Sequence, residues 1–110
     1  MLRPIITAAA AISILVGAAP SPASGPTSWT VDQKDKKFSR AEIRIHRGDT
    51  LTFVNNDAVT HNVFSSSDGF HFNLKRQAPG ARAAIPFPTR GTAQVRCAFH
   101  PNMRLSVTVE

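Results

Sequence analysis

The residues best suited to chemistry lie in the segment CAFHPNM, which spans residues 97–103. It contains Cys97, the only cysteine of the 110-residue chain, and Met103, the only methionine besides the initiator. His100 lies between them, so a thiol, an imidazole and a thioether follow one another at every third residue. In a tight turn this spacing lets all three side chains converge on one point, where they form a soft-to-borderline set of metal ligands.

One Cys, two His and a weak axial Met make up the ligand set of blue-copper electron-transfer sites. The sequence therefore predicts one copper ion per chain and requires a second imidazole from another segment. His46 and His71 each alternate with apolar neighbours, which places them on outward strand faces. His61 follows the turn signal of residues 55–57 at the start of a strand, so it can reach the end of the domain and is the predicted fourth ligand.

These ligands need a frame, and the pattern of the chain predicts an all-β one. Apolar and polar residues alternate over short segments, and Gly, Pro, Asn and Asp separate these segments. The predicted strands cover residues 42–46, 50–53, 59–65, 70–74, 83–88, 92–97 and 104–110, and residues 65–69 are predicted to be a loop. The prolines of residues 83–88 predict an edge strand, because proline cannot donate to a strand ladder. The pattern implies one antiparallel sandwich or barrel, with residues 97–103 as a loop between two neighbouring strands.

The first residues have the pattern of a secretory signal peptide. Arg3 precedes the apolar residues 5–19, and the small residues of PSPAS follow, with a predicted cut after Ala23. The apolar run is shorter than the roughly 20 residues that span a bilayer, so no membrane span is expected after cleavage. We therefore expect a signal peptide over residues 1–23 and a single domain over residues 24–110. The alanine-rich signal favours a bacterial periplasm, where one unpaired cysteine suits a buried or metal-bound thiol.

The chain is basic, with a formal net charge of +6. Its cations are scattered except for KDKK at residues 34–37 and KR at residues 75–76, and no basic helix or RNA-binding sheet motif occurs. This pattern argues against a nucleic-acid-binding protein. It favours a solvated surface whose positive charge steers an acidic redox partner toward the protein. We expect the protein itself to be a monomer.

The segments THNVFS (residues 60–65) and CAFHPNM resemble those of the cupredoxin, or blue copper, family, and in particular its small members of the amicyanin and plastocyanin type. GDTLTFVNND, APG and the spacing from Gly91 to Cys97 are similar as well. The resemblance implies a Greek-key β-sandwich, one copper cycling between Cu(I) and Cu(II), and shuttling of electrons between a donor and an acceptor protein. The ligands that it implies are His61, Cys97, His100 and Met103. It also implies that Asn62 ties the two ligand segments together by hydrogen bonds.

Several alternatives stay open beside this interpretation. A copper trafficking protein of the same fold would need an exchangeable site, which a thiolate does not favour. An enzyme is not expected: one domain without a second His cluster lacks an open catalytic copper, and no acid is apparent that would orient His100 for hydrolysis by Cys97. Phe99 and Pro101 either form an apolar rim for partner docking or only shape the loop. His71 is a candidate for a second, weak metal contact.

Overall fold

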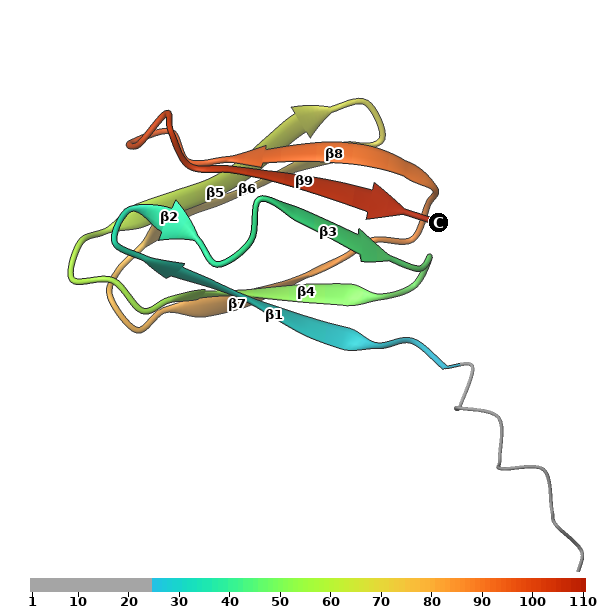
Figure 1. The fold of residues 1–110 in the computed structure, drawn as a ribbon, viewed down its shortest axis with the longest axis horizontal. Coiled ribbons are helices and arrows are strands. Elements are labelled where there is room, and N and C mark those ends of the chain that lie inside the picture. The colour runs from blue at the N-terminus through green and yellow to red at the C-terminus, as the bar shows by residue number, and fades with distance from the viewer. Residues whose placement is uncertain (1–24) are drawn as a thin grey trace, which may run out of the picture.

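The structure is a computed structural model that describes residues 25–110, and these residues form a sandwich of two β-sheets (Figure 1). The predicted signal peptide, residues 1–23, lies outside the described residues. Every regular element between residues 25 and 110 is a strand. The strands are β1 (Ser28–Lys34), β2 (Lys37–Phe38), β3 (Glu42–Ile45), β4 (Thr50–Asn55), β5 (His61–Ser67), β6 (Phe70–Gln77), β7 (Arg82–Pro86), β8 (Gly91–Arg96) and β9 (Arg104–Val109). This part of the chain has no helix long and apolar enough to cross a membrane.

The chain passes repeatedly between the two sheets. One sheet has the strand order β2-β1-β4-β7, and the other has the order β3-β9-β8-β5-β6. Most neighbouring strands are antiparallel, but β1 pairs in parallel with β4, and β3 with β9. The predicted β-sandwich is confirmed, and so is the edge position of the proline-containing strand, since β7 ends its sheet.

The core fills the space between the sheets, because alternate residues of each strand point inward. Strand β4 illustrates the pattern: Leu51 and Phe53 are fully buried, whereas Thr50 and Thr52 are half-buried. In the opposite sheet the buried side chains of β8 and β9 include Val95, Leu105 and Val107. At one end of the sandwich this buried layer continues into Cys97 and Met103, which are 2% and 1% exposed.

Two details differ from the sequence-based expectation. The serine-rich residues 65–67 belong to β5 and do not form a loop, because they pair with β6 through to Phe70, and the turn occurs at residues 68–69. Ser65 is buried at 4% exposure. Although serine is polar, its side chain is small enough to fit on the inner face of the sheet. A hairpin between β1 and β2 was not predicted. Asp35 and Lys36 form its turn with positive φ angles of 53° and 58°, the backbone conformation that a two-residue turn of this kind requires.

Candidate metal centre

The predicted ligand loop connects two neighbouring antiparallel strands. The pairing of β8 with β9 extends to Arg96 opposite Arg104, so residues 97–103 are closed at their base by a strand pair. Within the loop the backbone N–H of Met103 donates to the carbonyl of His100 at 2.9 Å, which makes the turn tight. Figure 1 shows this loop at the same end of the sandwich as the segment before β5 and the β1–β2 turn.

Three of the predicted ligands come together at this end. One donor atom from each of His61, Cys97 and His100 lies within 4.8 Å of the others. The two Nδ1 atoms are 3.1 Å apart, and the sulfur of Cys97 lies 4.0 Å from Nδ1 of His61 and 3.8 Å from that of His100. His61 and Cys97 are buried, whereas His100 is half-buried and reaches the surface.

This donor set fits a borderline-to-soft metal ion. Donors around one ion with metal–nitrogen distances near 2.0 Å and metal–sulfur distances near 2.3 Å lie roughly 3.3–3.8 Å from one another, close to the separations found here. Two imidazole nitrogens and a sulfur that face one another suit copper, because thiolate and imidazole are its preferred ligands. The backbone N–H of Asn62 also donates to the sulfur of Cys97 at 3.2 Å, as suits a thiolate acceptor.

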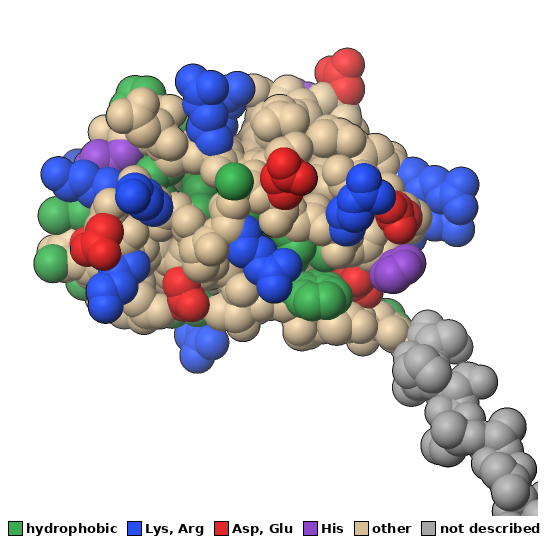
Figure 2. All heavy atoms as spheres, viewed as in Figure 1, with side chains coloured by type: hydrophobic (Ala, Val, Ile, Leu, Met, Phe, Trp, Pro, Cys, Tyr) green, Lys and Arg blue, Asp and Glu red, His purple; other side chains and the backbone are tan. Residues whose placement is uncertain are grey.

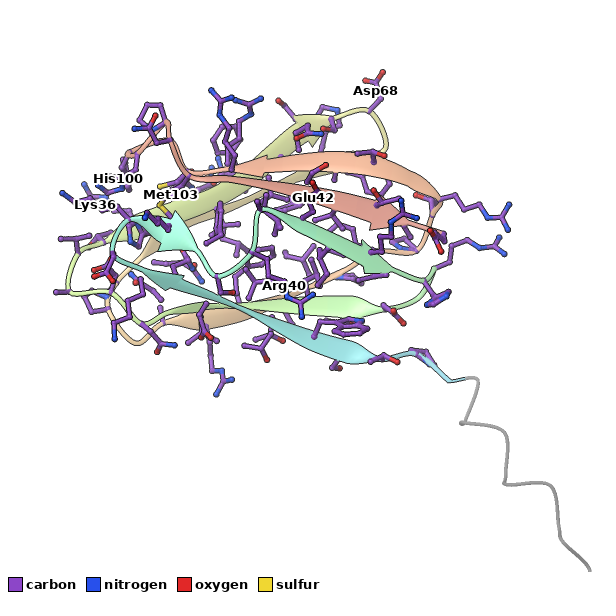
Figure 3. All side chains as sticks on the ribbon, in the orientation of Figure 1. Lys36, Arg40, Glu42, Asp68, His100 and Met103 are labelled. Carbon is purple, nitrogen blue, oxygen red and sulfur yellow. The ribbon has the colours of Figure 1, made fainter. Side chains whose placement is uncertain are left out.

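Met103 lies next to this group. Its side chain is buried, and Figure 3 shows its sulfur at the same end of the sandwich as His100. A thioether at this place is compatible with a weak axial ligand, and that role stays a prediction. His46 and His71 are exposed and lie outside the group of His61, Cys97 and His100.

A carboxylate that the sequence analysis missed orients His61. Oδ2 of Asp57 lies 2.8 Å from Nε2 of His61 and accepts the backbone N–H of Lys36 at 2.8 Å. These contacts lower the pKa of Asp57 to about 2, and the hydrogen bond from Lys36 contributes more to this shift than the one with His61. An anionic acceptor at Nε2 places the His61 proton there and leaves the lone pair of Nδ1 directed at Cys97. An acid four residues before the ligand was the available signal.

Asn55 shapes the turn that carries Asp57. Its Nδ2 donates to the carbonyls of Val59 and Gln77 at 2.9 and 2.8 Å, and its Oδ1 accepts the N–H of Asp57 at 2.9 Å. The side chain is fully buried at the end of β4, so the turn is tied to both sheets. The sequence marked residues 55–57 only as a turn.

The side chain of Asn62 is held from two sides. Its Oδ1 accepts the backbone N–H of Ala98 at 3.1 Å. Its Nδ2 donates to Oδ1 of Asn73 at 2.8 Å and to the carbonyl of Lys75 at 2.9 Å. Lys75 has a positive φ of 59°, and its own N–H donates to Asn73 at 2.8 Å. This arrangement connects the ligand loop through β5 to β6.

Comparison with known proteins agrees with this geometry. The family model for copper binding proteins of the plastocyanin/azurin family matches residues 26–110. The chain belongs to this family. The expected membership of the cupredoxins is therefore confirmed, and copper is the metal that both the family and the donor set indicate.

Similar members of the plastocyanin/azurin family include two amicyanins. Amicyanin-alpha of Methylorubrum extorquens is 33% identical over 109 residues, which cover 94% of this chain and 87% of the relative. Amicyanin of Paracoccus denitrificans is 31% identical over 84 residues, which cover 73% of this chain and 63% of the relative. The solved structure of a reduced amicyanin variant superimposes with a TM-score of 0.68 at 31% identity, over 76% of this chain and 82% of that one. The likeness to small cupredoxins thus covers both sequence and fold.

Proposed function

We propose that this protein is a small periplasmic electron carrier that passes single electrons between redox proteins. One copper ion would be held by His61 at the start of β5 and by three residues of the loop between β8 and β9, namely Cys97, His100 and Met103. The observation that carries this proposal is the convergence of two imidazole Nδ1 atoms and one thiol sulfur within 4.8 Å.

Copper bound there supplies one-electron chemistry, Cu(II) + e⁻ ⇌ Cu(I). The surrounding residues hold the donors in a fixed arrangement. Burial of His61 and Cys97 keeps water away from them, and the hydrogen bonds of Asp57 and Asn62 fix their orientation. His100 is the donor nearest the surface, so it is the route by which an electron would leave.

A carrier fits these residues better than an enzyme does. A catalytic metal keeps a position open for substrate or water, whereas four protein donors would close this site. We therefore assign the chain no reaction beyond electron exchange.

The periplasmic location follows from the predicted signal peptide. Cleavage after Ala23 would leave residues 24–110 as the mature domain. N-terminal sequencing of the protein recovered from the periplasmic fraction of a bacterial host tests this, and a mature protein that begins with Met1 in the cytosolic fraction contradicts it.

The copper assignment is tested by the visible spectrum after Cu(II) is added to the apo-protein. The wild type should develop an intense blue band from thiolate-to-copper charge transfer, and ascorbate should bleach it reversibly. Cys97→Ser should lack the band, and His71→Gln should keep it as a matched histidine control. A band that survives in Cys97→Ser would contradict the ligand set. Rapid loss of copper to a chelator would favour a trafficking protein.

A further inference from the structure

The surface around the ligand loop has two hollows that share Phe99. One, of about 390 Å³, lies between this loop and the β1–β2 turn and is lined by Lys36 and Lys37. The other, of about 270 Å³, lies toward β6 and is lined by Lys75 and Arg76. We call these four exposed cations the basic collar. Figure 2 shows Lys and Arg side chains around hydrophobic atoms at the left end of the molecule, where Figure 1 has the β1–β2 turn.

Apolar side chains are exposed at the same end of the sandwich, and we call Val59 and Phe99 the apolar tip. Among residues 25–110, the large apolar side chains that are clearly exposed are Val59, at 36%, and Phe99, at 47%. Val59 belongs to the segment that leads into His61, and Phe99 directly precedes His100. Both therefore lie at the end of the sandwich where the metal ligands meet. An exposed apolar patch with a polar rim is typical of an interaction site.

Contacts fix two parts of the collar, the side chain of Arg76 and the backbone of Lys36. The guanidinium of Arg76 lies 5.8 Å above the centre of the Phe99 ring, a cation–π contact. The backbone N–H of Lys36 donates to Asp57, so the β1–β2 turn is fixed against the segment that precedes His61.

The field at this end is positive. Asp35 is the one acidic residue that lines either hollow, against the four cations of the collar. The carboxylate of Asp57 is engaged by His61 and Lys36 and contributes little to the outer surface. An incoming partner therefore meets an apolar centre with positive charge around it, beside the half-buried His100.

We propose that the basic collar and the apolar tip together form the docking surface for an acidic redox protein. Carboxylates of that partner would pair with the collar while an apolar patch packs on Phe99, which brings its redox centre close to His100. A protein partner is favoured over an anionic membrane, because a bilayer on this face would cover His100 without offering a redox centre that could take up the electron. The inference rests on the proposed electron-carrier function.

Two double variants of equal net charge test the proposal. Lys37→Glu with Arg76→Glu changes the collar. Arg47→Glu with Arg90→Glu makes the same change in net charge in the loops before β4 and β8, at the opposite end of the sandwich.

Each copper-loaded protein, in its reduced form, is mixed in a stopped-flow instrument with an oxidised acidic c-type cytochrome at several salt concentrations. At low salt the collar variant should react about tenfold more slowly than the wild type and lose most of its salt dependence, because local charge steers association. The control should stay close to the wild type.

Equal losses in both variants would overturn the proposal, since net charge alone would then explain them. A rate independent of salt, or a faster reaction with a basic cytochrome, would also overturn it. Collar-dependent binding to phosphatidylglycerol vesicles without an effect on the cytochrome reaction would assign the surface to a membrane and overturn the protein partner. A wild type without the blue band, or one that ascorbate cannot reduce, would instead refute the electron-carrier function itself.

Discussion

One ring nitrogen of His61 contacts a carboxylate and the other faces the proposed metal ligands, and neighbouring residues determine which nitrogen has which role. Nε2 faces the carboxylate of Asp57 at 2.8 Å, so Nδ1 faces Cys97 and His100. A carboxylate behind a ligand histidine fixes the tautomer and raises the basicity of the donor nitrogen. Asp57 also accepts the backbone N–H of Lys36, and this hydrogen bond keeps the carboxylate in place.

Removal of the Asp57 charge should therefore weaken copper binding. In Asp57→Asn, His61 loses its anionic acceptor, and we expect the affinity for Cu(I) to fall by about tenfold or more. Competition with a Cu(I) chelator of known affinity measures this. Asp35→Asn is the matched control: it removes the same charge from the β1–β2 turn, where the residue has no contact with His61, and should leave the affinity near that of the wild type. Equal losses would attribute the effect to net charge.

Asn73 should stiffen the ligand loop through Asn62. Asn73→Ala removes the oxygen that accepts from Asn62 Nδ2 and from Lys75, so the Asn62 amide can rotate away from Ala98. We expect the Ala98 amide proton of the apo-protein to exchange about fivefold faster, the effect of weakening one hydrogen bond by about 1 kcal/mol.

Hydrogen exchange followed by NMR measures this, and the blue band of the copper-loaded variant should shift in energy. Asn73→Asp retains the acceptor and should restore both properties. Unchanged exchange in Asn73→Ala would show that Asn62 is held without this contact.

At the scale of residues, the sequence predicted the members of the site better than their supports. Cys97, His100 and His61 could be selected because their types and spacing suit a metal and because a strand end places His61 within reach. Asp57 had only a weak signal, an acid four residues before His61, and Asn73 had none, since an acid in a turn or an amide in a strand is most often solvated. Their roles depend on contacts across strands that only the folded register creates.

At the scale of elements, a buried carboxylate fastens the start of β1 to the loop before β4. Asp49 is 3% exposed, and its two oxygens accept the N–H groups of Thr27 and His46 and the Nε1–H of Trp29, at 2.8–3.1 Å. These contacts lower the pKa of Asp49 below its ordinary value of 3.8, and the hydrogen bond from Thr27 contributes most to this shift. This cluster helps to hold β1 in its parallel pairing with β4, in which Ser28 lies opposite Thr50.

Loss of this carboxylate should destabilise the fold in a pH-dependent way. We expect Asp49→Asn to lower the free energy of unfolding by about 2–3 kcal/mol at pH 7, because a neutral amide cannot accept all three donors. Since the pKa is depressed in the folded state, the stabilisation is present above pH 3.8 and is lost as the pH falls through the folded pKa.

Urea titrations followed by fluorescence of Trp29, the single tryptophan, measure this at several pH values. The free energies of unfolding of the variant and the wild type should approach each other as the pH falls below 3.8. Asp68→Asn, in the exposed turn between β5 and β6, is the control and should have little effect. A difference that stays constant down to pH 2 would contradict a role for the charge.

The elements themselves were predictable where apolar and polar residues alternate, as in β4, β8 and β9. The pattern failed at residues 65–67, because a run of serines carries no alternation even though Ser65 faces inward and Ser66 outward. It also failed to predict the two parallel pairings, since strand partners distant in sequence leave no local signal. The β1–β2 hairpin bears on the proposed function, because it supplies the N–H of Lys36 to Asp57 and two of the four cations of the basic collar.

At the scale of the whole molecule, the proposed ligands join segments that are far apart in the unfolded chain. His61 begins β5, whereas Cys97, His100 and Met103 belong to the loop between β8 and β9. All three strands lie in the same sheet, in which β8 is the neighbour of β5. The unfolded chain holds no preformed site, so binding of copper to the native state should appear as added stability.

Copper should therefore raise the unfolding temperature strongly. If free Cu(I) is present at a thousand times its dissociation constant, linkage predicts about 4 kcal/mol of added stability. For a domain of this size, that corresponds to a rise of roughly 15–30 °C in Tm. Scanning calorimetry of the apo-protein, the copper-loaded protein and the loaded protein after removal of copper by a chelator measures the rise and its reversal. Cys97→Ser should show a much smaller rise, because the ligand expected to bind most strongly is absent. An equal rise in Cys97→Ser would mean that copper stabilises the fold from a different site.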